Sequence, residues 1–98
     1  MIPFRPPGPE KGPVLYYFHA AWCEPCKWSE PVVNEILNHF GSSMALQKID
    51  IDLFPETARH LHVLSVPSFI LFQNGNEVWR YRGFDASPVM IREMEKYI

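Results

Sequence analysis

The sequence predicts a single α/β domain in which a mixed β-sheet carries helices on both faces. Three observations lead to this fold class. Residues 14–18 and 68–73 are short β-prone apolar runs, residues 24–40 have the period of an amphipathic helix, and strand-like and helix-like segments alternate along the chain. A length of 98 residues suits one domain, and 47% hydrophobic residues can fill a core without cross-links.

The first thirteen residues differ in composition from the rest of the chain. They are rich in proline, which forbids a helix and argues against a central strand; the prolines are Pro3, Pro6, Pro7, Pro9 and Pro13. We therefore expect residues 1–13 to form an extended proline-rich arm and residues 14–98 to form the folded domain. The uninterrupted apolar run at 14–18 is typical of a buried parallel strand.

Residues 24–40 predict the longest helix. Apolar side chains recur every fourth residue, and Gly41 follows where a helix commonly ends; the recurring residues are Trp28, Val32, Ile36 and Phe40. Pro31 lies inside this segment and should kink the helix, because it cannot donate a backbone hydrogen bond to Lys27.

The remaining elements follow in a regular order. We expect a strand at 44–51, a short helix at 55–62, a strand at 68–73, a hairpin turn at 74–76 and a returning strand at 77–82. Ser87 is expected to cap a last helix, with Pro88 at its first position and Met90, Ile91, Met94 and Ile98 on its apolar face. The predicted order is β-α-β-α-β-β-α, with parallel strands joined by right-handed crossovers and a terminal hairpin.

Composition excludes some functional classes. The net charge is −2 and the basic residues are scattered, which argues against nucleic-acid binding. No apolar stretch approaches the ~20 residues that span a membrane. The first thirteen residues lack the apolar region of a signal peptide, so we expect a cytoplasmic protein, or an exported one if a leader has been removed.

The two cysteines, Cys23 and Cys26, are separated by two residues. A disulfide that closes so short a loop adds little stability, so a chemical role explains the pair better. A zinc site is the alternative, but zinc needs about four ligands and the sequence has no second cysteine pair. The histidines also lack the spacing of a Cys-x-x-Cys…His-x-x-x-His site; they are His19, His39, His60 and His62.

The position of the pair indicates how it reacts. The cysteines lie where the first predicted strand meets the long helix, and a helix N-terminus stabilises a thiolate. We expect Cys23, at the helix start and more exposed, to be the nucleophile. Cys26, one turn deeper on the same face, is placed to attack a mixed disulfide at Cys23 and release the partner.

Several segments together resemble the thioredoxin family. The resemblance runs from about residue 14 to residue 98 and rests on Trp22-Cys23-Glu24-Pro25-Cys26-Lys27, Pro31, Lys48-Ile49-Asp50-Ile51-Asp52, Val66-Pro67-Ser68, Phe72-Gln73-Asn74-Gly75 and Gly83. It implies a thioredoxin-like fold and a protein-disulfide reductase that reduces or exchanges disulfides through the Cys23–Cys26 couple. It also implies no bound cofactor or metal, disulfide-containing client proteins, and a reductase or other electron donor.

The resemblance implies further site residues. Pro67 matches the family's cis-proline opposite the cysteines, and the backbone of Val66 would pair with an extended client segment. Alternatively, Pro67 simply starts a strand. Trp22, Pro67 and Gly83 would form an apolar docking rim, to which Glu24 and Pro25 of the motif also belong.

The sequence departs from the family in several places. The family has a strand and a helix before the strand at 14–18, and a thirteen-residue proline-rich segment cannot supply both. Tyr17 stands where the family has a buried aspartate, and Lys48 has lost that partner. Glu24 adds a negative charge beside Cys23, which opposes thiolate formation. His19 replaces a tryptophan and either favours the thiolate as a cation or packs as a neutral ring.

Three functional hypotheses follow. The first is a general protein-disulfide reductase, and the second is an oxidoreductase dedicated to one client. The third is a binding module that keeps the fold and recognises partners through the Trp22–Pro67 rim, although the intact cysteine pair argues against it. An insulin-reduction assay separates the third hypothesis from the others. We expect a monomer in each case.

Overall fold

The computed structural model describes residues 12–98. The elements are β1 (Pro13–His19), α1 (Glu24–Phe40), a 3-10 turn (Gly41–Ser43), β2 (Ala45–Asp50), α2 (Pro55–His60), β3 (Ser68–Gln73), β4 (Asn76–Arg82) and α3 (Ser87–Met94). The predicted order β-α-β-α-β-β-α is confirmed. The predicted proline-rich arm lies outside the described residues, apart from Gly12 and Pro13, the second of which already belongs to β1.

The four strands form one mixed sheet in the order β2-β1-β3-β4. β1 and β2 are parallel, whereas β3 is antiparallel to both β1 and β4. The expectation that the third strand is also parallel is therefore wrong. Helix length gives a physical reason: the 17 residues of α1 span about 25 Å and return the chain to the start of β2, whereas the 6 residues of α2 span only about 9 Å.

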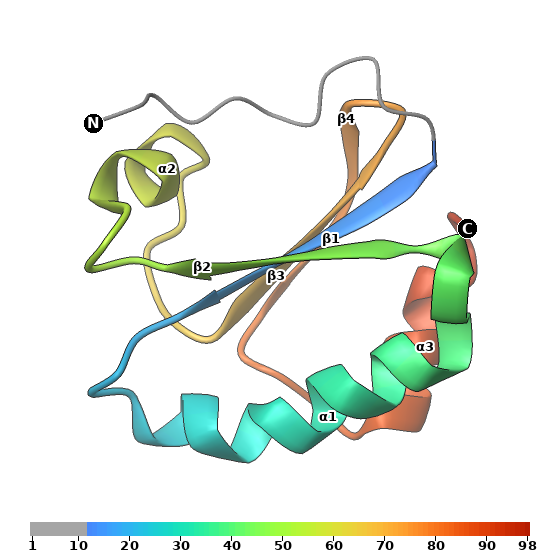
Figure 1. The fold of residues 1–98 in the computed structure, drawn as a ribbon, viewed down its shortest axis with the longest axis horizontal. Helices are drawn as coiled ribbons and strands as arrows, with labels where there is room; N and C mark the ends of the chain where they lie inside the picture. Colours follow the sequence, from blue (N-terminus) through green and yellow to red (C-terminus); the bar gives the residue numbers. More distant parts are fainter. Residues whose placement is uncertain (1–11) are drawn as a thin grey trace.

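The two faces of the sheet carry separate apolar clusters. Along β1, Leu15 and Tyr17 belong to the apolar cluster of one face. Figure 1 shows α1 and α3 on the same side of the sheet, and their residues Val33, Ile36, Met90 and Met94 belong to this cluster. Val14, Tyr16 and Phe18 belong to a second cluster on the other face. Figure 1 shows α2 on this side of the sheet. β1 is therefore buried on both sides, and the carboxyl end of this central strand leads directly into the turn before α1.

The bounds predicted for α1 are confirmed, but one of its predicted core residues is wrong. The buried side of the helix consists of Cys26, Ser29, Val33 and Ile36, whereas Trp28 is 70% exposed. Trp28 follows Cys26 by two residues, which on an α-helix places it far around the circumference from the buried side. The same geometry brings the polar Ser29 into the core.

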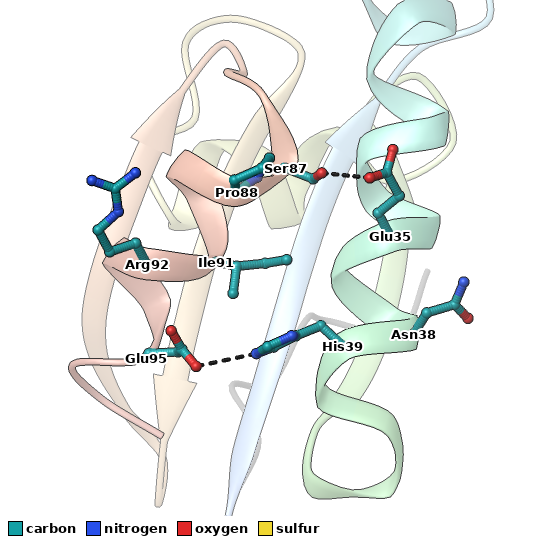
Figure 2. A pocket seen from close by; sticks show the side chains of 8 residues that line it. All are labelled: Glu35, Asn38, His39, Ser87, Pro88, Ile91, Arg92 and Glu95. Carbon is teal, nitrogen blue, oxygen red and sulfur yellow. Dashed lines mark hydrogen bonds and ion pairs between the residues drawn. The ribbon is translucent and has the colours of Figure 1, made fainter.

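The start of α3 also differs from the prediction. Ala86 is the N-cap residue, and Ser87 is the first helical residue. The Ser87 hydroxyl instead donates to the Glu35 carboxylate of α1 at 2.6 Å, and His39 of α1 lies 3.1 Å from Glu95 (Figure 2). These two contacts connect α1 to the two ends of α3, whose core residues Met90 and Met94 lie between them in the sequence.

The predicted hairpin turn is confirmed. Asn74 and Gly75 have φ values of 52° and 85°, the positive values that an Asn-Gly turn between antiparallel strands adopts. Within residues 12–98, none of the helices is both long and apolar enough to cross a membrane.

Candidate active site

The two cysteines lie at the junction of β1 and α1 and form a disulfide. Cys23 is the N-cap residue of α1, and Pro25 lies in the first turn, a position where the missing N–H of proline costs no helical hydrogen bond. The backbone N–H of Cys26 donates to the Cys23 sulfur at 3.2 Å. The predicted position of Cys23 at a helix N-terminus is therefore confirmed.

The expected difference in exposure between the cysteines is wrong. Cys23 is 3% exposed and Cys26 is 5% exposed in the oxidised protein. Both pack against Ala20, Ile51 and Val66 in a small apolar cluster. Exposure therefore does not distinguish the two cysteines, whereas their positions relative to the start of α1 do.

The segment before β3 faces the cysteines from the opposite side. The Val66 carbonyl oxygen lies 3.6 Å from the Cys23 sulfur. The Val66–Pro67 peptide bond is cis, and Gly83 donates its backbone N–H to the Pro67 carbonyl at 2.8 Å. The structure thus brings Cys23, Val66, Pro67 and Gly83 together from three separate segments of the chain.

The outer rim of the site combines one large apolar side chain with charged groups. Trp22, the residue before Cys23, is 67% exposed, and its indole N–H donates to Asp52 at 2.8 Å, which restricts the orientation of the ring. Glu24 and Lys27 are both exposed and form an ion pair at 3.2 Å. The negative charge predicted beside Cys23 is therefore partly neutralised by its own helix.

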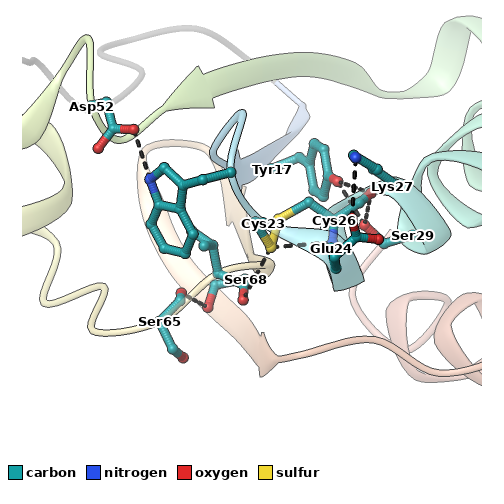
Figure 3. The surroundings of a disulfide bond; sticks show 11 residues. Tyr17, Cys23, Glu24, Cys26, Lys27, Ser29, Asp52, Ser65 and Ser68 are labelled. Atoms are coloured by element: carbon teal, nitrogen blue, oxygen red, sulfur yellow. Dashed lines mark hydrogen bonds and ion pairs between the residues drawn. A yellow bond between two sulfur atoms is a disulfide. The ribbon is translucent and has the colours of Figure 1, made fainter.

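Beneath the cysteines lie two buried hydroxyl groups. The oxygens of Tyr17 and Ser29 are 2.6 Å apart, and both side chains are 0% exposed. The Cys26 carbonyl oxygen lies 2.8 Å from the Ser29 hydroxyl oxygen and 3.2 Å from the Tyr17 hydroxyl oxygen, as Figure 3 shows. Burial raises the pKa of Tyr17, and this effect outweighs the opposing hydrogen bond from Ser29.

The remaining predicted modulators surround Tyr17. The His19 ring stacks on the Tyr17 ring at a centroid distance of 5.5 Å. The Lys48 ammonium lies 5.9 Å from the Tyr17 ring centroid and forms an ion pair with Glu30 at 3.0 Å. Lys48 therefore has an acidic partner, although not one at position 17.

Sequence reasoning missed Ser29, Glu30 and the contact of Asp52 with Trp22. A signal for Ser29 was present, because it lies three residues after Cys26 and four before Val33, on the buried side of the helix. The partners of Glu30 and Asp52 are 18 and 30 residues away in the sequence, so periodicity could not find them. Within the part of the chain that the structure describes, no group of three or more His, Cys, Asp or Glu side chains could hold a metal ion.

Comparisons with known proteins agree with this geometry. The thioredoxin family model matches residues 8–96. A thioredoxin from Mycobacterium tuberculosis is 40% identical over 86 residues, which cover 88% of this chain and 74% of that protein. A bifunctional thioredoxin reductase/thioredoxin from Mycobacterium leprae is 38% identical over 86 residues, covering 88% of this chain and 19% of that protein.

A solved structure of thioredoxin-2 from a malaria parasite has a TM-score of 0.85 and 27% sequence identity, covering 90% of this chain and 85% of that one. The sequence comparison and the fold comparison therefore both point to thioredoxins, and the family match includes the residues that form the disulfide site. The chain belongs to the thioredoxin family and is a thiol–disulfide oxidoreductase.

Proposed function

We propose that this protein reduces disulfide bonds in other proteins, with Cys23 as the nucleophile and Cys26 as the resolving thiol. The observation that carries the proposal is the position of Cys23 at the N-cap of α1, where the Cys26 N–H points at its sulfur. An N–H group and the positive end of a helix both stabilise a thiolate over a thiol. Cys26 lies within the helix and has no such position.

The reaction consists of two thiol–disulfide exchanges. The Cys23 thiolate attacks one sulfur of the client disulfide, a new S–S bond forms, and the other client sulfur leaves as a thiolate. Cys26 then loses its proton and attacks the Cys23 sulfur, which releases the second client sulfur and forms the Cys23–Cys26 disulfide. The client gains two electrons and two protons overall, and the protein loses them.

The rim is proposed to bind an extended client segment. The Val66 carbonyl already faces the Cys23 sulfur, so a client chain that pairs with the Val66 backbone would bring its own sulfur to Cys23. Trp22, with its exposed ring held by Asp52, would provide apolar contact beside it, together with Pro25, Pro67 and Gly83.

The partners and setting of the reaction are also proposals. A reductase must return two electrons to the disulfide after each cycle. The relative from M. leprae is named as a bifunctional thioredoxin reductase/thioredoxin, a name that combines such a reductase with a thioredoxin. We propose a cytoplasmic monomer in which residues 14–98 are the catalytic unit and residues 1–13 an attached arm. Gel filtration of the full chain tests the monomer.

Insulin reduction with dithiothreitol as electron source tests the activity. We expect turnover in the parent protein and none in Cys23→Ser. Cys26→Ser should retain the first exchange and accumulate a client mixed disulfide on Cys23. Iodoacetamide labelling at neutral pH, mapped by mass spectrometry, should modify Cys23 before Cys26. Faster labelling of Cys26, or trapping by Cys23→Ser instead, would reverse the assigned roles.

A further inference from the structure

The hydroxyl groups beneath the disulfide form a closed hydrogen-bonded set. Tyr17 comes from β1 and Ser29 from the second turn of α1, and both contact the same atom, the carbonyl oxygen of Cys26. Each hydroxyl has one proton to donate. One proton bonds the two hydroxyl oxygens to each other, and the other is donated to the Cys26 carbonyl oxygen. The set therefore connects the central strand to the first turn of the helix at the residue that carries the second sulfur.

We infer that Tyr17 and Ser29 act as a pair of positioning residues for Cys26 and set the rate at which it resolves the mixed disulfide. Neither hydroxyl is placed to react with the client. They act together on the backbone of Cys26, because one hydroxyl donates to its carbonyl oxygen and the other is hydrogen-bonded to that donor. This backbone must keep the Cys26 sulfur aligned with the Cys23–client bond while that bond breaks. Small displacements from alignment are costly for such in-line attack.

The pair should affect Cys26 more than Cys23, because Cys23 has other contacts that hold it. The Cys23 backbone N–H donates to the Ala20 carbonyl at 3.2 Å, and its sulfur lies against the Val66 carbonyl. Neither contact involves Tyr17 or Ser29. Cys26 is held by the helix itself and by the two hydroxyls, so their removal frees the first turn of α1 at this residue.

The groups that face the pair come from each element packed against it. His19 stacks on the Tyr17 ring from β1, Lys48 approaches it from β2, and Glu30 of α1 is paired with Lys48. β3 contributes Phe69, which does not titrate. Burial raises the pKa of Tyr17, so the hydroxyl pair stays protonated across the neutral range and its own charge does not change there.

The inference rests on the proposed roles of Cys23 and Cys26, and a two-step assay tests both separately. The reduced protein is mixed with the aromatic disulfide DTNB in a stopped-flow instrument. Attack by Cys23 releases one coloured thiolate and leaves a mixed disulfide on Cys23. Attack by Cys26 then releases the second thiolate and forms the Cys23–Cys26 disulfide. The two releases report the two exchange steps.

We expect Tyr17→Phe and Ser29→Ala each to slow the second release by about fivefold, the rate equivalent of one lost hydrogen bond, and the first release by less than twofold. The double variant should be little slower than either single variant, since the two hydroxyls act as one unit. Ser29→Thr keeps a hydroxyl and should restore most of the rate. Ser87→Ala serves as the matched control. It removes another buried serine hydroxyl, which belongs to α3 and contacts Glu35 instead of the disulfide region.

The outcomes separate the two levels of the argument. A parent protein that releases only one thiolate, or whose Cys26→Ser variant still releases two, would overturn the proposed roles of the cysteines. Two normal releases in the parent with an unchanged second step in both hydroxyl variants would overturn the inference alone. Equal slowing of both steps, or equal slowing by Ser87→Ala, would show a general loss of structure and also overturn it.

Discussion

Replacing Tyr17 by phenylalanine should make the stability of the protein less sensitive to alkaline pH. The Tyr17 side chain is fully buried, and burial raises its pKa. In the unfolded chain the phenol titrates near its ordinary value of about 10. Between that value and the raised pKa of the folded state, unfolding releases a proton. The stability that Tyr17 contributes is therefore complete below about pH 10 and is lost as the pH rises toward the folded-state pKa.

The magnitude follows from one proton and the hydrogen bonds of one hydroxyl. In the neutral range the phenylalanine variant loses the contacts with Ser29 and the Cys26 carbonyl, which costs about 1 kcal/mol of unfolding free energy. Above about pH 10 the parent loses stability by up to about 1.4 kcal/mol per pH unit through this phenol, and the variant does not. The difference between the two proteins should therefore shrink as the pH rises.

Urea unfolding of the oxidised proteins between about pH 7 and 11 measures this difference, because the disulfide removes both thiols from the titration. Tyr97→Phe changes a tyrosine that is 40% exposed and should leave the pH dependence of the parent intact. Parallel stability curves for the parent and Tyr17→Phe would refute the claim that burial keeps this phenol protonated.

Two further predictions concern the rim. Glu24→Gln should speed alkylation of Cys23 at neutral pH by no more than about threefold, because Glu24 is exposed and already paired with Lys27. The gain should disappear at high salt. A gain that persists at high salt would contradict an electrostatic origin. Trp22→Ala should lower kcat/KM for insulin reduction by about tenfold, as loss of an aromatic contact at an interface does, while the DTNB rates change less. Equal losses with both substrates would argue against a docking role for Trp22.

The sequence was most informative where one segment carries its own signal. The apolar run of β1, the limits of α1 and the Asn-Gly turn all follow from neighbouring residues, and the structure has them as predicted. The position of Cys23 at the start of α1 follows in the same way. Each of these features depends on backbone geometry within a few residues.

Features that depend on partners far along the chain were less accessible. Tyr17 could be placed in the core, but its contact with Ser29 joins a strand to a helix twelve residues later. Trp28 was assigned to the core because it fits one four-residue repeat with Val32 and Ile36, although the buried side of α1 begins at Cys26. The direction of β3 depends on how the chain returns from β2 through the six residues of α2, which no local pattern in β3 itself indicates.

The charges around Tyr17 and Ser29 explain why this buried pair is neutral. A carboxylate at position 17 would be desolvated against Phe69 and would need a cation to offset that cost. A nearby cation among the described residues is Lys48, which donates to both carboxylate oxygens of Glu30 at 3.0 Å. With Lys48 engaged at the surface, a phenol that finds a neutral partner in Ser29 avoids an unpaired buried charge. Positions 17, 29 and 30 should therefore change together: an acid at position 17 is favoured only where residue 30 leaves Lys48 free.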